Sequence, residues 1–487
     1  MITVSLTDSM IIPSAPNKNE SEGWDCRNFP HIMTAVSILR GQIASGTVSC
    51  QSIRSSRCGE ITPDLINCES YGCKVYSKAL LPTDLKFTTS HYIGQAIVDV
   101  DGCPEHRVQF LIRPRMGNQL RDYLLGMVSN VYIPERFSST GCGGGENDNQ
   151  WLLLLVWRCA FEQAIKKAAV PKTYVFRSEN LKRFRGRLNV ARHIQHNLTD
   201  QSNMFCDFRP LTMDTTINRT IRYVYRLVAN SDLKGALRTF SDLAEHDERL
   251  ASFGVGSGPV SPEKIDRIVY TRMTEPYRQV MELSKIVIRG FGARDLGHGS
   301  PAPAFFVDMA ELWECYLMRV FRERLPEYAF VSPNDGRERY WMFDRKRSVR
   351  PDFFAKDETG RIIAVIDAKY KRYACIGRTA VDRHAVSRDD LYQISTYLYR
   401  FADPAKPTVG LFVSPYEKAG NDVENVIDGN HRIGVCNLSL PLIVDDDSDD
   451  DRREKLSASR RDIVNRLREE EEDFADRFRR IIRKSVG

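Results

Sequence analysis

The sequence contains no long apolar run and no recognisable targeting segment. Its nearest approach to a membrane helix, residues 151–157, falls far short of the about 20 apolar residues that a membrane-spanning helix requires. The mean hydropathy of −0.38 is that of a soluble protein. The N-terminus shows no basic region followed by an apolar one, so no signal peptide is predicted. These absences exclude an integral membrane protein, and we expect a cytoplasmic one.

Motifs for nucleotide hydrolysis and for paired-cysteine sites are also missing. Without a GxxxxGK[ST] loop, the chain is not expected to bind or hydrolyse a nucleotide itself. The 12 cysteines include no CxxC pair, and Cys68 and Cys73 are the closest two. Six cysteines precede residue 104, which leaves a small metal site there open. Reduced thiols, as in cytoplasmic proteins, are the simpler interpretation.

Length and composition predict a multidomain α/β protein. A chain of 487 residues, 42% of them apolar, is expected to form two or three domains with apolar cores. The net charge is +6, and the acidic run at residues 445–451 conceals a more basic remainder. This charge is compatible with a nucleic-acid partner but does not by itself identify one.

Residues 350–371 carry the most informative pattern in the chain. Asp352 follows a proline and precedes two phenylalanines in an extended segment. The polar residues that end at Gly360 suit a hairpin loop, and the β-branched apolar run at residues 362–366 predicts a strand buried on both faces. We therefore expect a β-hairpin.

Three charged side chains of this hairpin suit a metal-dependent DNA nuclease. Because side chains alternate along a strand, Asp367 and Lys369 are expected on one face, within reach of Asp352. Two neighbouring carboxylates suit Mg²⁺, with Mn²⁺ as a substitute, and the lysine would stabilise negative charge on a phosphate. The alternative is an ordinary hairpin with surface charges, although charged residues rarely end a buried strand without a partner or a metal.

Two predicted helices flank the hairpin. Residues 305–325 form an amphipathic pattern with Glu314 at the edge of its apolar stripe. Glu314 is either a third metal ligand or a glutamate that extends to solvent. Residues 387–401 predict a second helix, on which three polar residues share one side, namely Asp390, Gln393 and Tyr397. Gln393 is a candidate contact to a metal-bound water or to the DNA backbone, whereas Tyr397 is expected to pack.

This region resembles the PD-(D/E)XK nuclease domain of the McrC family, the nuclease subunits of modified-cytosine-dependent restriction systems. The resemblance rests on the segments RPDFF, VIDAKYK, MAELWE and DLYQISTY. It extends to residues 179–197, 205–224 and 277–290 and, more loosely, to residues 93–102 and 110–117. Carried over to this chain, the family's catalytic positions are Asp352, Asp367, Lys369, Glu314 and Gln393, the first two and Glu314 as metal ligands.

The resemblance also implies a fold and a partner. It implies a C-terminal restriction-endonuclease-like domain, with a mixed central sheet flanked by helices, after a helical middle region and a β-rich N-terminal domain. In such systems an McrB-like AAA+ GTPase ring recognises the modified site and drives translocation. The chain is then expected to be a Mg²⁺-dependent endodeoxyribonuclease subunit that cuts modified double-stranded DNA and stimulates the ring.

We divide the sequence into five expected segments. They are residues 1–88, unassigned and either a small domain or partly disordered; 89–149, a β-rich partner-docking domain; 150–294, mainly helical; 295–443, the nuclease domain; and 444–487, an acidic linker and a charged helix. The last helix has an apolar edge for docking on the body or on a partner, formed by Ile463, Leu467, Phe474, Phe478 and Ile481.

Two further groups of cations are candidate binding residues. The candidates for DNA phosphate contacts are Lys182, Arg183, Arg185, Arg187 and Lys371, with Gly186 allowing close approach. The alternative for the first four is a structural turn whose arginines hold neighbouring domains or carboxylates. Arg113 and Arg115 are candidates for contact with the partner nucleotidase, because arginines supplied across an interface stabilise phosphoryl transfer.

Two other functions remain open at this stage. The chain could be the nuclease of another defence or repair system that works with a helicase or a different ATPase. It could also be a non-catalytic adaptor that only activates a motor, although the intact Asp352, Asp367 and Lys369 argue against this. The sequence does not specify the DNA modification, or whether GTP or ATP drives the partner.

Overall fold

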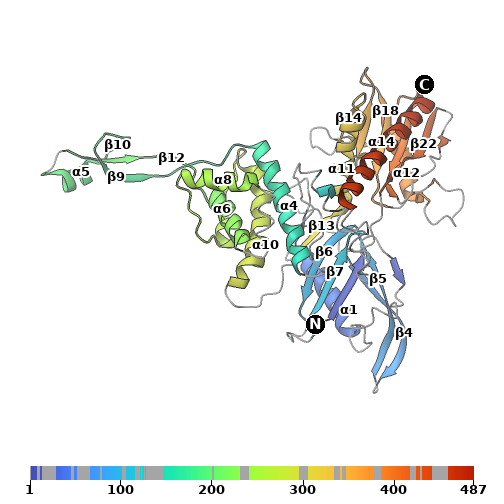
Figure 1. Ribbon diagram of the computed structural model, residues 1–487, viewed down its shortest axis with the longest axis horizontal. Coiled ribbons are helices and arrows are strands. Elements are labelled where there is room, and N and C mark those ends of the chain that lie inside the picture. Colours follow the sequence, from blue (N-terminus) through green and yellow to red (C-terminus); the bar gives the residue numbers. More distant parts are fainter. Residues whose placement is uncertain are drawn as a thin grey trace. The chain divides into compact units, whose positions relative to one another are not determined.

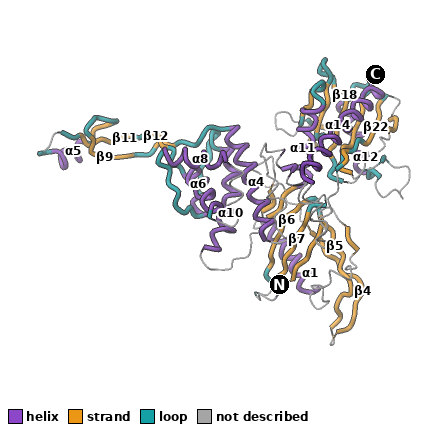
Figure 2. The backbone as a smooth tube through the Cα atoms, in the orientation of Figure 1, coloured by secondary structure: helices purple, strands orange, loops and turns teal. Residues whose placement is uncertain are grey.

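The chain divides into two compact units, which are described separately. The computed structural model describes residues 2–7, 11–13, 29–44, 49–51, 66–76, 79–100, 102, 106–115, 121, 123–125, 127, 146–199, 202–230, 241–295, 305–333, 340–342, 347–371, 373, 375–376, 385–416, 424–427, 430–440 and 459–486. The first unit contains residues 1–54, 58–145 and 304–487, and the second contains residues 55–57 and 146–303. Helices and strands occur in both (Figures 1 and 2), which confirms the predicted mixed α/β class.

A five-stranded sheet forms the N-terminal part of the first unit. Its strands, in spatial order, are β1 (Ile2–Thr7), β7 (Val108–Arg113), β6 (Tyr92–Val98), β13 (Phe305–Asp308) and β3 (Ser49–Gln51). A second sheet contains β2 (Ile11–Pro13), β5 (Ala79–Thr89) and β4 (Ile66–Tyr76). Helix α1 (Phe29–Ala44) buries Ile32 and Leu39 in one core with Phe110 and Phe306. The segment left unassigned in the sequence thus contributes regular structure.

Strand β13 corrects the predicted helix at residues 305–325. Phe305–Asp308 is extended and pairs with β6 and β3, and helix α11 begins at Met309 with Asp308 as its N-cap. An apolar FFV triplet fits a strand and a helix alike, and its partner strands lie far earlier in the chain. Gly94 permits this pairing, because its φ is +143° and a Cβ atom there would lie 2.0 Å from the carbonyl oxygen of Phe305.

A six-stranded mixed sheet forms the C-terminal part of the same unit. Its strands, in spatial order, are β14 (Ala329–Val331), β17 (Phe353–Lys356), β18 (Ile362–Ala368), β19 (Val409–Val413), β22 (His431–Val435) and β21 (Glu424–Ile427). Strands β18, β19 and β22 run parallel, and the other pairs are antiparallel. Two small sheets pair β15 (Trp341–Met342) with β16 (Arg347–Ser348) and β20 (Pro415–Tyr416) with β23 (Leu438–Ser439).

The predicted hairpin is confirmed as β17–β18. The two strands are antiparallel, and residues 363–366 are buried, as expected for a strand covered on both faces. Asp357 closes the loop, since its Oδ1 accepts hydrogen bonds from the backbone N–H groups of Thr359 and Arg361, both at 3.0 Å. Gly360 adopts a φ of +81°, which favours glycine.

Helices cover both faces of the six-stranded sheet. Helix α12 (Arg388–Phe401) matches the helix predicted at residues 387–401, with Ser387 as its N-cap, and its Ile394 and Leu398 share a core with Phe354. On the opposite face, Phe353 packs edge-on against Phe321 of α11 (Met309–Arg324), with ring centroids 5.3 Å apart. Consecutive strand residues therefore contact different helices, as the alternation of side chains requires.

The C-terminal helix α14 (Ser459–Val486) docks on the body of the first unit. Four residues of its predicted apolar edge are buried, namely Leu467, Phe474, Phe478 and Ile481. Helix α14 packs against α11 and the strands β18 and β19. Its Glu471, only 1% exposed, accepts a hydrogen bond from the Tyr316 hydroxyl at 2.7 Å and pairs with the Arg324 guanidinium at 2.9 Å.

The second unit consists of helices and a small β module. Its helices are α4 (Glu146–Lys167), α6 (Thr216–Ala229), α8 (Ser241–Ser252), α9 (Pro262–Asp266), the 3-10 turn η5 (Glu275–Tyr277) and α10 (Arg278–Asp295). The β module, which the sequence did not predict, contains β8 (Thr173–Tyr174), β9 (Arg177–Leu181), β10 (Arg187–Leu188), helix α5 (Val190–Asn197), β11 (Met204–Phe208) and β12 (Leu211–Thr212). A buried ion pair between Arg222 of α6 and Asp247 of α8, at 2.7 Å, joins two of the helices.

Some sequence predictions concern parts of the chain outside the described residues. They include the acidic run at residues 445–451, and the side chains of Cys68 and Cys73 as a possible metal site. Among the helices that the structure describes, none has the length and apolar character needed to span a membrane.

The buried Glu471 pair predicts a measurable stability difference. Glu471→Gln removes the buried negative charge that accepts hydrogen bonds from Tyr316 and Arg324, and we expect it to lower the free energy of unfolding by about 2 kcal/mol, because hydrogen bonds to a charged group are among the stronger ones. Glu472→Gln is the matched control, since its carboxylate also pairs with Arg324 but is 56% exposed. It should cost less than about 1 kcal/mol. Equal shifts in chemical-denaturation midpoints would contradict the buried role.

Candidate active site

The hairpin brings Asp352 and Asp367 together at one end of the six-stranded sheet. Asp352 directly precedes β17, and Asp367 is the last residue but one of β18. The backbone N–H of Ala368 donates a hydrogen bond of 2.7 Å to Asp352 Oδ2, which ties the first carboxylate to the strand that carries the second. Asp367 is only 3% exposed, so it requires a cation or hydrogen-bond donors nearby.

Like charges gather around Asp352. Burial raises its pKa well above the usual carboxyl range, and the negative charges of Glu314 and Asp367 raise it further. Glu314 lies on α11 and is half-buried, as the sequence predicted. Negative charges from the hairpin and from α11 thus act on the same carboxyl group.

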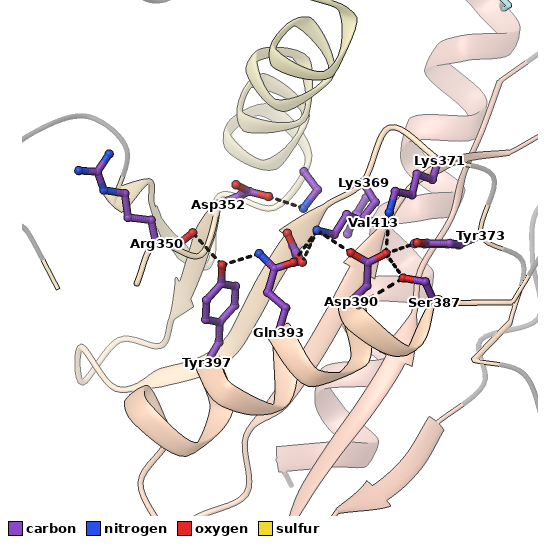
Figure 3. A network of polar contacts seen from close by, with 12 residues as sticks. Arg350, Asp352, Lys369, Lys371, Tyr373, Ser387, Asp390, Gln393, Tyr397 and Val413 are labelled. Atoms are coloured by element: carbon purple, nitrogen blue, oxygen red, sulfur yellow. Dashed lines mark hydrogen bonds and ion pairs between the residues drawn. The ribbon is translucent and has the colours of Figure 1, made fainter. Parts of the chain in front are cut away.

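Lys369 lies between the hairpin and helix α12 (Figure 3). Its Nζ is 3.0 Å from Asp367 Oδ2, 3.1 Å from Asp390 Oδ1 and 2.7 Å from Gln393 Oε1. Burial lowers the pKa of Lys369, but the carboxylates of Asp367 and Asp390 outweigh burial and hold that pKa above its usual range. The lysine is therefore a fixed positive charge at the carboxylate cluster.

Helix α12 supplies a row of polar side chains to this end of the sheet. Gln393 Nε2 donates to the Tyr397 hydroxyl at 2.7 Å, and that hydroxyl donates to the carbonyl oxygen of Arg350 at 3.2 Å (Figure 3). The amide oxygen of Gln393 is thereby aimed at Lys369. Burial raises the pKa of Tyr397 to about 12, so it stays a neutral donor. Tyr397 is buried, as expected, but it also orients Gln393.

The donor set fits a divalent cation held by two carboxylates. Asp367 Oδ2 is buried and, its ion pair with Lys369 aside, accepts no hydrogen bond from the described residues. Mg²⁺ prefers such hard oxygen ligands and retains several waters, so two carboxylates suffice. In the part of the chain that the structure describes, no three acidic, His or Cys side chains enclose a metal position. Glu314 is thus near enough to act on Asp352 electrostatically without completing a three-ligand site.

The structure brings together four of the five residues predicted as catalytic, and the fifth, Glu314, acts on the pKa of Asp352 through its charge. The binding candidates are placed elsewhere or held by other groups. Lys371 is half-exposed, and its Nζ is 2.8 Å from Asp390 Oδ2. The guanidinium of Arg115 stacks over the Tyr370 ring at 4.1 Å, and Arg113 ends β7. The four basic candidates of the β module lie in the second unit, namely Lys182, Arg183, Arg185 and Arg187.

Sequence reasoning missed the role of Asp390. It placed Asp390 beside Gln393 on the predicted helix but assigned it no function. In the structure Asp390 is 6% exposed, and its Oδ2 accepts hydrogen bonds from the hydroxyls of Ser387 and Tyr373. Although burial opposes it, hydrogen bonds from Lys371, Ser387 and Tyr373 hold the pKa of Asp390 below its usual range. The available signal was a carboxylate at the third helical position after a Ser N-cap.

The raised pKa of Asp352 predicts an unusual stabilising substitution. The metal-free fold retains a proton that the unfolded chain releases above pH about 3.9, so stability falls as pH rises towards the folded pKa. Asp352→Asn keeps a hydrogen-bond acceptor for the Ala368 N–H and removes the fall in stability with rising pH. We expect it to raise the melting temperature at neutral pH in EDTA, and to change it little at about pH 3, where the carboxyl is mainly protonated in both states.

Asp357→Asn is the control for this measurement. The pKa of Asp357 is lowered by hydrogen bonds from Thr359 and Arg361, so losing its charge should lower the melting temperature at neutral pH. A destabilised Asp352→Asn protein would contradict the like-charge cluster.

Comparison with known proteins identifies the family. The model of the McrBC 5-methylcytosine restriction system component matches residues 89–410, more than half of the chain. A solved half-complex of Thermococcus gammatolerans McrB AAA+ hexamers with bound McrC contains a chain 17% identical, with a TM-score of 0.49 over 95% of this chain and 100% of that one. A second solved structure, the McrBC complex of the same organism, gives 19% identity and a TM-score of 0.33 over 67% and 89%. No curated protein matches. The family match confirms the resemblance seen in the sequence: the chain belongs to the McrBC family of 5-methylcytosine restriction system components.

Proposed function

We propose that this protein is the Mg²⁺-dependent endodeoxyribonuclease subunit of an McrBC-like restriction complex, with Mn²⁺ as a substitute cation. The observation that carries the proposal is the meeting of Asp352, Asp367 and Lys369 at one end of the β17–β18 hairpin, with Lys369 Nζ 3.0 Å from Asp367. A mixed sheet with helices on both faces supports a PD-(D/E)XK restriction-endonuclease-like domain. The reaction would be hydrolysis of a DNA phosphodiester in the cytoplasm.

Each residue of the site has a distinct part in this chemistry. Asp352 and Asp367 would hold the divalent cation, which when bound polarises the phosphodiester and makes a water more acidic. Asp352 releases its proton to become a ligand, so binding should strengthen as pH rises. Lys369 then stabilises the negative charge that develops on the phosphate. Glu314 and Gln393 would orient water at the edges of the site.

Family membership supports an AAA+ GTPase ring like McrB as the partner, since the matched family is a component of the McrBC restriction system. In this arrangement the ring selects modified double-stranded DNA and this chain cuts it. Arg113 and Arg115 are the proposed contacts to the ring. Arg115 stacks on Tyr370, the residue that follows Lys369, so this arginine lies beside the proposed active-site segment.

Plasmid cleavage tests the proposed nuclease. Asp367→Ala removes a proposed cation ligand, and we expect the rate with Mg²⁺ and the cognate motor to fall at least about 100-fold. The same variant should still stimulate the motor's nucleotide hydrolysis, because Asp367 is buried in the hairpin. Asp357→Ala, in the loop of that hairpin, is the control and should cut normally.

The other outcomes identify rival functions. Equal cleavage by Asp367→Ala and the wild type would reject the nuclease site, and motor stimulation without any cleavage by the wild type would indicate an adaptor. Co-purification of a helicase or an ATPase in place of a GTPase ring would indicate another defence or repair system.

The basic loop of the β module is a second proposed DNA contact, together with Lys371. Lys182 and Arg183 are exposed in the turn between β9 and β10. Arg185 instead lies 4.7 Å from the centre of the Phe208 ring, and a Cβ atom at Gly186 would lie 2.4 Å from the carbonyl oxygen of Asp207. The close approach at Gly186 therefore serves the packing of the module itself.

Salt dependence tests this contact. If both side chains neutralise phosphates, the double variant K182A/R183A should reduce the slope of log affinity against log salt by about 2, since each released counterion contributes nearly one. Arg185→Ala is the comparison and should mainly lower the stability of the module. An unchanged slope in the double variant would assign the loop to a partner other than DNA.

A further inference from the structure

The ammonium of Lys369 contacts side chains of two elements, strand β18 and helix α12, and only the side chain from β18 is a proposed cation ligand. Asp367 lies on β18, whereas Asp390 and Gln393 lie on α12 (Figure 3). A cation bound at Asp367 Oδ2 and the ammonium of Lys369 would compete for the same oxygen, since like charges repel at such short range. The acceptors on α12 are those that remain for the lysine once the cation is present.

Asp390 is built as a rigid acceptor for this lysine. Its Oδ1 is 3.1 Å from Lys369 Nζ, while its Oδ2 is held by Lys371 at 2.8 Å, by Ser387 at 2.6 Å and by the Tyr373 hydroxyl. Its backbone N–H also bonds to Ser387, the N-cap of α12. One oxygen is thus fixed by the surrounding elements and the other is directed at Lys369.

The charge of Asp390 distinguishes it from Gln393. A buried ammonium needs a negative counterion, and a neutral amide does not provide one. When the charge of Asp367 is taken up by a cation, Asp390 is the other carboxylate in contact with Lys369. Lys371 shares Asp390 but is half-exposed, so water also solvates it.

We propose that Asp390 is a positioning residue that holds the Lys369 ammonium on the α12 side of the site and leaves the Asp367 carboxylate available to the divalent cation. This inference rests on the proposed nuclease function. Without Asp390, Lys369 pairs with Asp367 and competes with the cation. Partners that orient the groups around a metal site change metal affinity by roughly 10- to 100-fold when removed.

Mn²⁺ binding to the full chain, measured by electron paramagnetic resonance without DNA or motor, tests this role. Asp390→Asn should weaken binding roughly 10- to 100-fold. In a Lys369→Met background the ammonium that competes with the cation is gone, so adding Asp390→Asn should change the Mn²⁺ affinity by less than about threefold. The difference between the effects of Asp390→Asn in the two backgrounds is the coupling expected of residues in contact. Asp389→Asn is the matched control, because it removes an exposed charge from the same helical turn and should leave the affinity unchanged.

The outcomes separate this role from the proposed function. Equal weakening by Asp390→Asn with and without Lys369 would overturn the positioning role, as would no weakening at all. If Asp390→Asn does not fold, Tyr373→Phe loosens the same carboxylate and should weaken binding only when Lys369 is present; a loss independent of Lys369 would again overturn it. Equal Mn²⁺ binding by Asp367→Ala and the wild type would instead overturn the proposed metal site, and the role of Asp390 with it.

Discussion

Burial and mutual repulsion among carboxylates at the end of the β17–β18 hairpin determine the charge balance of the site. Burial raises the pKa of Asp352 well above its usual range, and the negative charges of Glu314 and Asp367 raise it further. Such a cluster is stable only with protons or cations to balance it. Lys369 supplies one positive charge, and a divalent cation would supply the rest. The geometry thus favours a site that binds metal and loses a proton when it does.

The surrounding fold holds these charges in place against that repulsion. Helices on both faces bury the hairpin strands, and the N–H of Ala368 fixes the Asp352 side chain. Trp313 of α11 donates to the carbonyl oxygen of Val413 at 3.2 Å, and the same carbonyl accepts the Lys369 N–H at 2.9 Å. Gly410 keeps α12 close to β19, since a Cβ atom there would lie 2.8 Å from Ile394 Cγ1. Asp390 and Gln393 of α12 therefore reach Lys369 because α12 packs closely on β19 at Gly410, away from the site itself.

What the sequence could predict depended on how local each feature is. The hairpin follows from a polar loop and a β-branched run, so its strands, and the approach of Asp352 to Asp367, were accessible from patterns alone. The strand at Phe305–Asp308 was not, because its pairing with β6 depends on contacts with distant residues. The part played by Asp390 was equally hidden, since it depends on how α12 packs on β18. The small β module of the second unit has strands too short for a clear alternation.

The proposed cutting residues and the proposed DNA-contacting loop belong to different units of the chain. The residues that would break a phosphodiester lie on one hairpin and two helices of the first unit, and the basic loop of the β module belongs to the second. Membership of the McrBC family gives this division a purpose, because a restriction system must couple selection of DNA to its cleavage. In the proposed function, the hairpin would supply the chemistry of cutting, and the choice of site would fall to the partner.

Anomalous X-ray diffraction from crystals soaked in Mn²⁺ would locate the bound cation. We expect a single strong peak within about 2.2 Å of carboxylate oxygens of Asp352 and Asp367, as for a hard divalent cation. We also expect Lys369 Nζ to move away from Asp367 and to stay bonded to Asp390. A peak elsewhere, or a Lys369–Asp367 contact that persists beside bound Mn²⁺, would contradict this arrangement.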